Sequence, residues 1–288
     1  MPGHRKPKGE KHLVYLYGFA LAKGSRAAGM TGPAGLPPPP SQGVEDGVGV
    51  ACVEHLGIGA VVSLVPAKVY EEQPLEEHCK DPCWLAARAE RHNRVLLQIL
   101  EHTAVAPCRF GTLFRDFATV KEIIACNRRL LSKTLRRLQD RVEWSVKAYV
   151  TRPSRPSGDK HHGRTSSRRS GSERAQGAAY LLGLARARTA QREVDVRLRN
   201  HAKRIIGALS RLSEDVVLLP VRDTESDKGM IFLDLACLVK RGNMPAFASR
   251  LQKLGAGEKK NDIALSWSGP WPAYSFAGSS FHPAGRQV

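Results

Sequence analysis

The sequence is poor in cysteine and in aromatic side chains, and it has no long apolar run. Its six cysteines stand at irregular spacings among 288 residues, unlike the disulfide framework of a small secreted domain. No uninterrupted apolar stretch approaches the roughly 18 residues that a membrane-spanning helix requires. Because 42% of the residues are hydrophobic, the chain can still bury a core, and its length suggests one large domain or two ordinary ones.

The short motifs of phosphate binding and of catalysis are also missing. The chain has no Gly-x-x-x-x-Gly-Lys-Ser/Thr loop, and the pair Gly57 and Gly59 lacks the third glycine of a dinucleotide-binding turn. Neither His-Glu-x-x-His nor Gly-x-Ser-x-Gly occurs. The sequence therefore gives no positive argument for catalysis, and we expect neither an enzyme nor a bound cofactor.

Positive charge is present in excess. The chain has 45 Lys and Arg against 27 Asp and Glu, a formal net charge of +18. Residues 1–11 contribute four cations against one anion, and residues 152–174 contribute seven against two, so these segments supply 3 + 5 = 8 of the charge. The remaining +10 falls on segments with folding patterns, which predicts a generally basic surface.

This charge makes nucleic acid an alternative partner. Lysine and arginine release counterions from a phosphate backbone, and the 152–174 segment is the most basic part of the chain. That segment has no interleaved aromatic residues on which bases could stack, so it shows no means of specific recognition. We keep nucleic-acid binding through this segment as the second functional hypothesis.

The start of the chain allows two interpretations. A basic opening is followed by the apolar residues 13–22, which end in Ala20-Leu21-Ala22, a pattern that a signal peptidase could accept. The same residues, rich in valine, leucine and tyrosine, equally predict a buried first strand. We favour the strand and therefore expect a cytoplasmic protein.

The organisation of the chain predicts an α+β protein of two domains. Residues 1–11 form a disordered basic tail, and residues 12–150 an N-terminal α+β domain, interrupted by a Gly- and Pro-rich loop at 23–47. The expected elements of this domain are strands at 13–22, 48–53 and 58–65, a helix from Asp81 to about Glu101, a helix capped by Asp116, and a strand at 142–150.

A second α+β domain is expected at 175–276, after a disordered linker at 151–174 and before a C-terminal tail at 277–288. It begins with a long helix, or two consecutive ones, over residues 175–212. Strands at 216–221, 230–239 and 263–267 and a short helix at 245–254 follow. That order suggests an antiparallel sheet with helices on one face.

Four side chains could in principle bind zinc: His78, Cys79, Cys83 and Cys108. Cys79 and Cys83 flank Asp81-Pro82 without a Cys-x-x-Cys turn, and no second pair of cysteines follows at the distance found in zinc fingers. The alternative is that these thiols are packed in the core or idle. We expect no metal site.

Two segments have a composition that is unusual for ordinary loops. Pro107–Thr112 sets a cation beside an aromatic ring in a rigid turn, and Ser268–Phe276 combines two prolines with large apolar rings. The second segment could be an aromatic clamp that fastens the C-terminus to the core, or a docking surface. The candidate protein-binding residues are Arg109, Phe110, Gly111, Trp271, Pro272, Tyr274 and Phe276.

These segments belong to a series of motifs that resembles the GvpF/GvpL family of gas vesicle accessory proteins. The series is Tyr15-Leu16-Tyr17-Gly18, Trp84-Leu85 with Arg88, Arg91 and His92, Pro107 through Thr112, Trp144-Ser145-Val146-Lys147, Gly177 through Leu181, and Gly269 through Phe276. The motifs stand in the family's order and span residues 12–276, and the closing one is the most specific.

The resemblance implies a two-domain α+β fold, with both halves related to ferredoxin-like arrangements, and no enzymatic activity. It also implies an assembly factor, associated with gas vesicles, that engages the small hydrophobic shell protein and other gas vesicle accessory proteins. A subunit that polymerises through apolar surface would aggregate unless its edges were covered during assembly. Covering an edge requires no catalytic residue.

Overall fold

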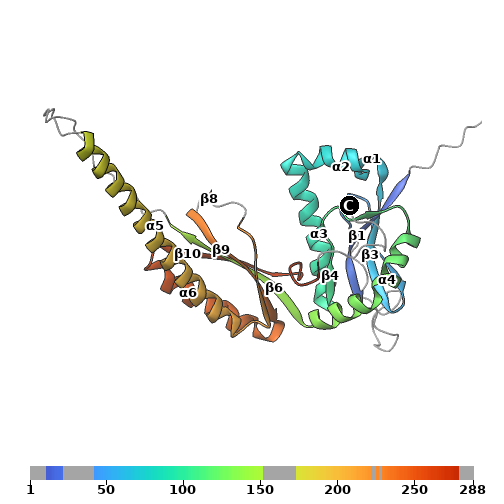
Figure 1. Ribbon diagram of the computed structural model, residues 1–288. Helices are drawn as coiled ribbons and strands as arrows, with labels where there is room; N and C mark the ends of the chain where they lie inside the picture. The colour runs from blue at the N-terminus through green and yellow to red at the C-terminus, as the bar shows by residue number, and fades with distance from the viewer. Residues whose placement is uncertain (1–10, 22–41, 152–172, 222–224, 227–228, 279–288) are drawn as a thin grey trace, which may run out of the picture. The chain divides into compact units, whose positions relative to one another are not determined.

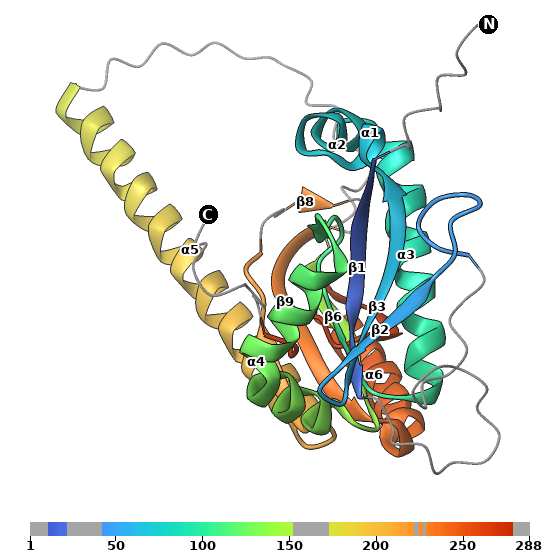
Figure 2. The same ribbon diagram turned by 90° about the vertical axis from the view of Figure 1, so that its right-hand side faces the viewer.

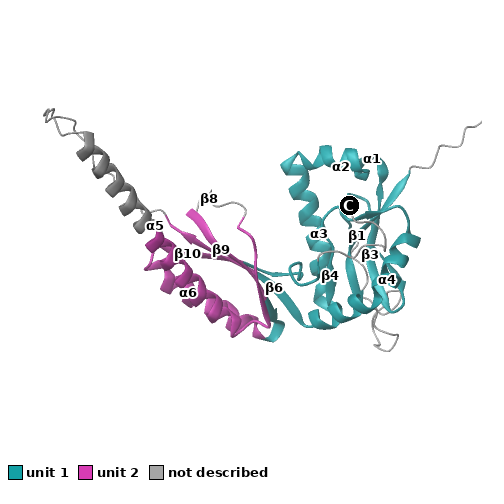
Figure 3. Cartoon of the chain, in the orientation of Figure 1, with its two compact units in different colours: residues 1–144, 238–242, 268–288 teal, residues 145–237, 243–267 magenta. Residues whose placement is uncertain are grey.

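The computed structural model describes residues 11–21, 42–151, 173–221, 225–226 and 229–278 (Figure 1). The chain divides into two compact units (Figure 3). Unit 1 contains residues 1–144, 238–242 and 268–288, and unit 2 contains residues 145–237 and 243–267. The disordered tail and linker expected at 1–11 and 151–174 lie almost entirely outside the described residues, as does most of the tail expected at 277–288.

Unit 1 is built on an antiparallel sheet with strand β1 (His12–Leu21) at its centre. The strand order is β2-β3-β1-β4, and β5 also pairs with β1. All but the two end residues of β1 are buried, which explains why the sequence of this strand is almost continuously apolar. The other strands are β2 (Ala51–His55), β3 (Ile58–Pro66), β4 (Val105–Pro107) and β5 (Leu113–Phe114).

Helices α3 (Pro82–His102) and α4 (Phe117–Leu138) cover opposite faces of this sheet (Figure 1). Both predicted caps are present: the Asp81 carboxylate accepts from the Cys83 backbone N–H at 2.9 Å, and Asp116 accepts from that of Thr119 at 2.8 Å. Two short helices, α1 (Ala67–Tyr70) and α2 (Glu72–Cys79), connect β3 to α3. The sequence patterns had not indicated these two helices.

Strands β2 and β3 form a hairpin, and β2 begins three residues later than the strand expected at 48–53. Leu56 and Gly57, both with positive φ, form a two-residue turn between the paired ends His55 and Ile58. Residues 43–48 instead close on themselves, because the Gly43 N–H donates to the Val48 carbonyl at 2.7 Å. They therefore do not pair with β3.

A second sheet has the strand order β10-β6-β9-β7, with β8 paired antiparallel with β9. Its strands are β6 (Arg141–Val150), β7 (Asp215–Leu218), β8 (Glu225–Ser226), β9 (Gly229–Lys240) and β10 (Ile263–Trp271). The sequence assigned the strand at 142–150 to the first domain, whereas β6 lies between β10 and β9. Alternating burial identifies a strand but not the strands that it pairs with.

The helices of unit 2 are α5 (Glu173–Ser210) and α6 (Met244–Lys259), which lie side by side (Figures 1 and 2). A short 3₁₀ helix at Arg241–Asn243 precedes α6. The buried carboxylate of Glu258 joins the two helices: it lies 2.7 Å from His201 Nδ1 and accepts from Arg204 Nε at 2.9 Å. One carboxylate thus meets two polar side chains of α5, which satisfies it inside the unit.

Gly18 is the tightest point of the first sheet and gives a test of its packing. A Cβ atom at this position would lie 2.6 Å from the Ala106 carbonyl oxygen and 3.1 Å from Pro107 Cα. Because backbone atoms cannot swing aside, we expect Gly18→Ala to lower the free energy of unfolding by about 1 to 3 kcal/mol, as measured by urea denaturation. Gly49→Ala is the control, since nothing lies within 4 Å of its Cβ position, and it should change stability by less than about 0.5 kcal/mol. Equal effects of the two substitutions would contradict this account.

Candidate protein-interaction site

Both segments that the sequence singled out lie in unit 1 and meet at the ring of His92. Phe110 comes from the connection between β4 and β5, and its ring centroid lies 6.1 Å from that of His92. Tyr274 follows β10 and stacks on His92 at 6.5 Å. Residues 164 positions apart (274 − 110) in the sequence therefore contact one side chain of α3.

His92 belongs to a continuous group of rings, which we call the aromatic cluster. Tyr15 is its centre, with ring centroids 4.9 Å from Tyr17, 5.9 Å from Tyr70 and 6.1 Å from Phe110. Several of these pairs are edge-to-face or tilted, which favours the electrostatics of aromatic rings. The members of the cluster are Tyr15, Tyr17, Tyr70, Trp84, His92, Phe110 and Tyr274.

A short chain of hydrogen bonds fixes the centre of the cluster. The Gly111 backbone N–H donates to the Tyr15 hydroxyl at 3.3 Å, and that hydroxyl lies 2.8 Å from His92 Nδ1. The Tyr15 hydroxyl thereby links the connection between β4 and β5 to α3. Burial raises the pKa of Tyr15, so the phenol stays protonated.

Burial also determines the charge of His92. Only 2% of this residue is exposed, and burial lowers its pKa to about 4, while the Cys108 backbone opposes the shift only in part. The ring is therefore neutral near pH 7. A neutral imidazole can pack edge-to-face with Phe110 and stack on Tyr274 without the cost of burying a charge.

The turn that carries Arg109 is held by its own backbone. The hydroxyl of Thr112 donates to the Arg109 carbonyl at 2.7 Å, and Gly111 has φ = +78°, which favours glycine. Leu16 N–H donates to the Thr112 carbonyl at 2.9 Å and ties the turn to β1. The Arg109 side chain itself is exposed.

The closing segment is fastened to the same unit by polar contacts. The Tyr274 hydroxyl donates to Asn93 Oδ1 at 2.8 Å, and Ser275 donates to Glu143 from both its backbone N–H and its hydroxyl, each at 2.8 Å. Burial raises the pKa of Glu143, and the two bonds from Ser275 counter that effect. Pro272 and Phe276 are buried, whereas Trp271 is partly exposed and donates from Nε1 to Ser268 Oγ.

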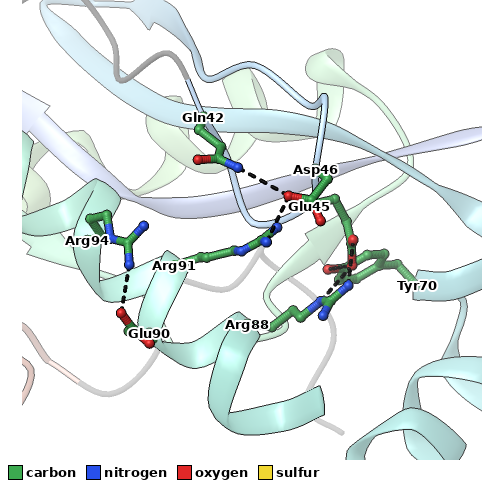
Figure 4. Close-up of polar contacts among 8 residues, drawn as sticks. All are labelled: Gln42, Glu45, Asp46, Tyr70, Arg88, Glu90, Arg91 and Arg94. Atoms are coloured by element: carbon green, nitrogen blue, oxygen red, sulfur yellow. Dashed lines mark hydrogen bonds and ion pairs between the residues drawn. The ribbon is translucent and has the colours of Figure 1, made fainter. Parts of the chain in front are cut away.

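A carboxylate that the sequence had placed in a loop lies beside the cluster (Figure 4). Glu45 accepts from Arg88 Nε at 3.0 Å and Nη2 at 2.9 Å, and from the Tyr70 hydroxyl at 2.9 Å. Next to it, Asp46 pairs with Arg91 at 2.8 Å. The sequence held a signal for these ion pairs. Two adjacent acidic residues stand in an otherwise Gly- and Pro-rich stretch, and α3 carries two arginines three residues apart.

A groove of about 960 Å³ opens beside the Arg109–Thr112 turn. Leu75 of α2 forms one wall, since the Cβ position of Gly111 lies 3.6 Å from its Cδ2. The apolar lining is Leu13, Tyr70, Pro74, Leu75, Gly111, Leu113 and Phe114, and the polar lining is Lys11, His12, Glu71, Glu72, Gln73 and Arg115. Apolar and charged side chains thus share the lining, a mixture that is common in protein-binding surfaces.

The candidate residues thus occupy different environments. Phe110 and Tyr274 meet at His92, and Gly111 hydrogen bonds into the cluster and lines the groove. Pro272 and Phe276 pack inside the unit, while Arg109 and part of Trp271 are accessible. A binding role for these seven residues stays a prediction.

The residues considered for zinc are not brought together. His78 stacks on Trp84 at 5.0 Å, Cys83 is exposed, and Cys108 is buried with its pKa raised to about 12. Across the described ranges, no three His, Cys, Asp or Glu side chains lie close enough to hold a metal ion. In those same residues, no helix has the length and apolar character needed to cross a bilayer.

Comparisons of the sequence with known proteins identify one family. The family model for the gas vesicle synthesis protein GvpL/GvpF matches residues 13–278. Gas vesicle protein L of Streptomyces sp. (strain CB03234) is 28% identical over 228 residues, 78% of this chain and 82% of that protein. Gas vesicle protein F2 of Halobacterium salinarum is 27% identical over 201 residues, 68% of this chain and 70% of that protein.

Solved structures share the fold. The crystal structure of the gas vesicle protein GvpF from Anabaena sp. PCC7120 has a TM-score of 0.62 at 15% identity, covering 93% of this chain and 97% of that one. That of GvpF from Microcystis aeruginosa has the same TM-score and identity, with 92% and 99% coverage. The expected α+β class, with two antiparallel sheets and packed helices, is confirmed.

The buried His92 should make stability depend on pH. Its pKa is about 6.5 in the unfolded chain and about 4 in the folded one, so below pH 6.5 the unfolded chain binds the proton more tightly. The stability contributed by the neutral ring is complete above about pH 6.5 and is lost as the pH falls toward 4, by about 2 kcal/mol at pH 5. Urea denaturation of the wild type and of His92→Gln at pH 7 and pH 5 measures this difference. If the variant loses as much stability between pH 7 and pH 5 as the wild type does, another group causes the pH dependence.

The ion pair between Glu45 and Arg88 should contribute more to the free energy of unfolding than an exposed ion pair does. The side chains of Arg88 and Glu45 are only 21% and 16% exposed, so Glu45→Gln leaves a largely desolvated guanidinium without its anion. We expect a loss of about 2 to 4 kcal/mol in the free energy of unfolding. Glu90→Gln is the matched control, because Glu90 pairs with Arg94 at the surface, and should cost at most about 0.5 kcal/mol.

Proposed function

The chain belongs to the GvpL/GvpF family of gas vesicle synthesis proteins, and from this premise we propose that it is an assembly factor that binds the hydrophobic shell protein of the gas vesicle. Family membership establishes a gas vesicle accessory role. The proposal adds the direct contact with the shell protein and assistance to the nucleation or growth of the vesicle. Other gas vesicle accessory proteins are further proposed partners.

The observation that carries this proposal is the groove beside the Arg109–Thr112 turn. Leucine, tyrosine and phenylalanine side chains line it, together with charged side chains of both signs, Lys11, Glu71, Glu72 and Arg115. Such a surface can cover an apolar segment of a partner while remaining wetted at its edge. A shell subunit that is waiting to polymerise exposes apolar surface of this kind, and transient cover would keep it from aggregating.

The aromatic cluster supports the proposal by keeping the groove in shape. Gly111, which lines the groove, is bonded to the buried Tyr15 hydroxyl, and Phe110 packs on the neutral His92. A preformed surface loses less conformational entropy on binding than a loose one. We place the shell contact at the groove, with Arg109 and Trp271 as accessible candidates and with Phe110, Gly111, Pro272, Tyr274 and Phe276 as its support.

We propose that this role is non-enzymatic. The buried ionisable groups of the aromatic cluster and beside it take part in structural contacts: the Tyr15 phenol bonds to His92, and Glu45 is held by Arg88 and Tyr70. Covering an apolar surface needs shape and burial rather than proton transfer. We also propose that the protein acts in the cytoplasm, in association with gas vesicles.

Co-purification of the tagged protein with the shell subunit, in the presence of nuclease, tests the proposal. We expect the shell subunit to be retained at about 150 mM and about 500 mM salt, because an apolar contact is not screened as surface charge is. Leu75→Glu should reduce retention at least about tenfold, since it places a charge against the groove floor. Leu218→Glu, the same change at an exposed leucine of unit 2, should have no effect.

Two other results would contradict the proposal. Equal retention by the Leu75→Glu and wild-type proteins would remove the groove as the contact. Loss of the shell subunit at high salt, with nucleic acid recovered from samples without nuclease, would favour the alternative function through the 152–174 segment. That segment lies outside the described residues.

A further inference from the structure

The outward face of α4 is strongly and asymmetrically basic. The apolar side of this helix, from Val120 to Leu138, packs on the first sheet, so its other side faces solvent. Over Phe117–Leu138 the helix carries six cations and one anion, a net charge of 6 − 1 = +5. All seven charged side chains are exposed: Lys121, Glu122, Arg128, Arg129, Lys133, Arg136 and Arg137.

Three cations of α4 are not paired with a carboxylate in the part of the chain that the structure describes, in contrast with the arginines of α3. On α3, Arg88 pairs with Glu45, Arg91 with Asp46 and Arg94 with Glu90. Among the described residues, no carboxylate lies within ion-pair distance of Arg129, Lys133 or Arg136 of α4. Arg88, Arg91 and Arg94 of α3 are thus paired within the unit, whereas Arg129, Lys133 and Arg136 of α4 remain available to a partner.

The spacing of three of these cations places them in a line along the helix. Arg129, Lys133 and Arg136 stand at i, i+4 and i+7, so their side chains lie along one line of the helix. At a rise of about 1.5 Å per residue, this line is about 10 Å long. Leu130, which is 51% exposed, lies at the edge of the same face.

Carboxylates at the same helical spacing would match this line. An amphipathic helix with glutamates at i, i+4 and i+7 places its charges about 10 Å apart end to end and can bring an apolar residue against Leu130. A nucleic acid fits less well, because the exposed residues from Lys121 to Arg137 include no aromatic side chain for base stacking and do include an apolar one. A second copy of this chain is disfavoured by its net charge of +18.

We propose that the outward face of α4 is a docking surface for the acidic face of a helix from another protein. Arg129, Lys133 and Arg136 pair with its carboxylates, and Leu130 provides an apolar contact at the edge. This surface is distinct in residues and in chemistry from the groove beside the Arg109–Thr112 turn, so neither proposal depends on the other.

Fluorescence anisotropy with a labelled peptide tests the surface. The probe is a helical peptide of about 20 residues with glutamates at i, i+4 and i+7 and leucines beside them, and a second peptide has glutamine at every glutamate. At about 150 mM salt we expect the full-length protein to bind the glutamate peptide at least about tenfold more tightly than the glutamine peptide. The triple variant Arg129→Glu, Lys133→Glu, Arg136→Glu should lose at least about tenfold in affinity.

The matched control reverses three exposed lysines instead, two in α6 and one, Lys260, directly after it. Lys253→Glu, Lys259→Glu, Lys260→Glu changes the net charge by the same amount and should alter the affinity by less than about twofold. Leu130→Ser should weaken binding about threefold and do so equally at about 500 mM salt, because its contribution is apolar. Circular dichroism confirms that each variant is folded, as expected for substitutions at exposed positions.

Three results would overturn the proposal. Equal loss in the two triple variants would mean that net charge alone attracts the peptide. Tighter binding of a duplex DNA of matched charge, abolished by the α4 reversals, would identify a nucleic-acid surface. Absence of binding to the glutamate peptide by the folded wild-type protein would leave the α4 face without the proposed partner.

Discussion

The burial of an uncharged His92 is the constraint on which the rest of unit 1 depends. Its ring lies between a turn from the first half of the chain, through Phe110, and the closing segment, through Tyr274. Tyr15 of the central strand bonds to the same ring and to Gly111. A protonated ring would place an unpaired charge at this junction, so the packing of three distant segments is most stable while the imidazole is neutral. The groove beside Gly111 takes its form from the same arrangement.

Charge is distributed in the opposite way on the two helices that cover the first sheet. The arginines of α3 are matched by carboxylates from neighbouring segments, and the pair Glu45 and Arg88 also holds the Tyr70 hydroxyl of the aromatic cluster. Arg129, Lys133 and Arg136 of α4 are exposed along one line of the helix. Ion pairs hold Glu45 and Asp46 against α3, whereas these three cations are available for association. The basic composition of the chain therefore contributes to the fold on one side of the sheet and to the surface on the other.

Much of the local structure follows from neighbouring residues. Asp81 and Asp116 cap their helices as their sequence context predicts. Leu56 and Gly57, both with positive φ, make the tight turn between β2 and β3. The apolar run of β1 reflects its place between two helices, each covering one face of the sheet. Residues 43–48 were less predictable, because their closing hydrogen bond competes with strand pairing, and neither choice is dictated by periodicity. The short helices α1 and α2 leave an equally weak signal in the sequence.

The sequence by itself determined the α+β class, most of the helices and strands, and the order of motifs that places the chain in its family. It also singled out Phe110 and Tyr274, but not the fact that both contact His92. Only the tertiary structure decided that contact, the pairing of Glu45 with Arg88, and the position of β6 between β10 and β9. Caps, turns and periodicity arise from residues a few positions apart. Ring contacts and sheet partners join residues tens to hundreds of positions apart, and the packing of the whole unit selects them.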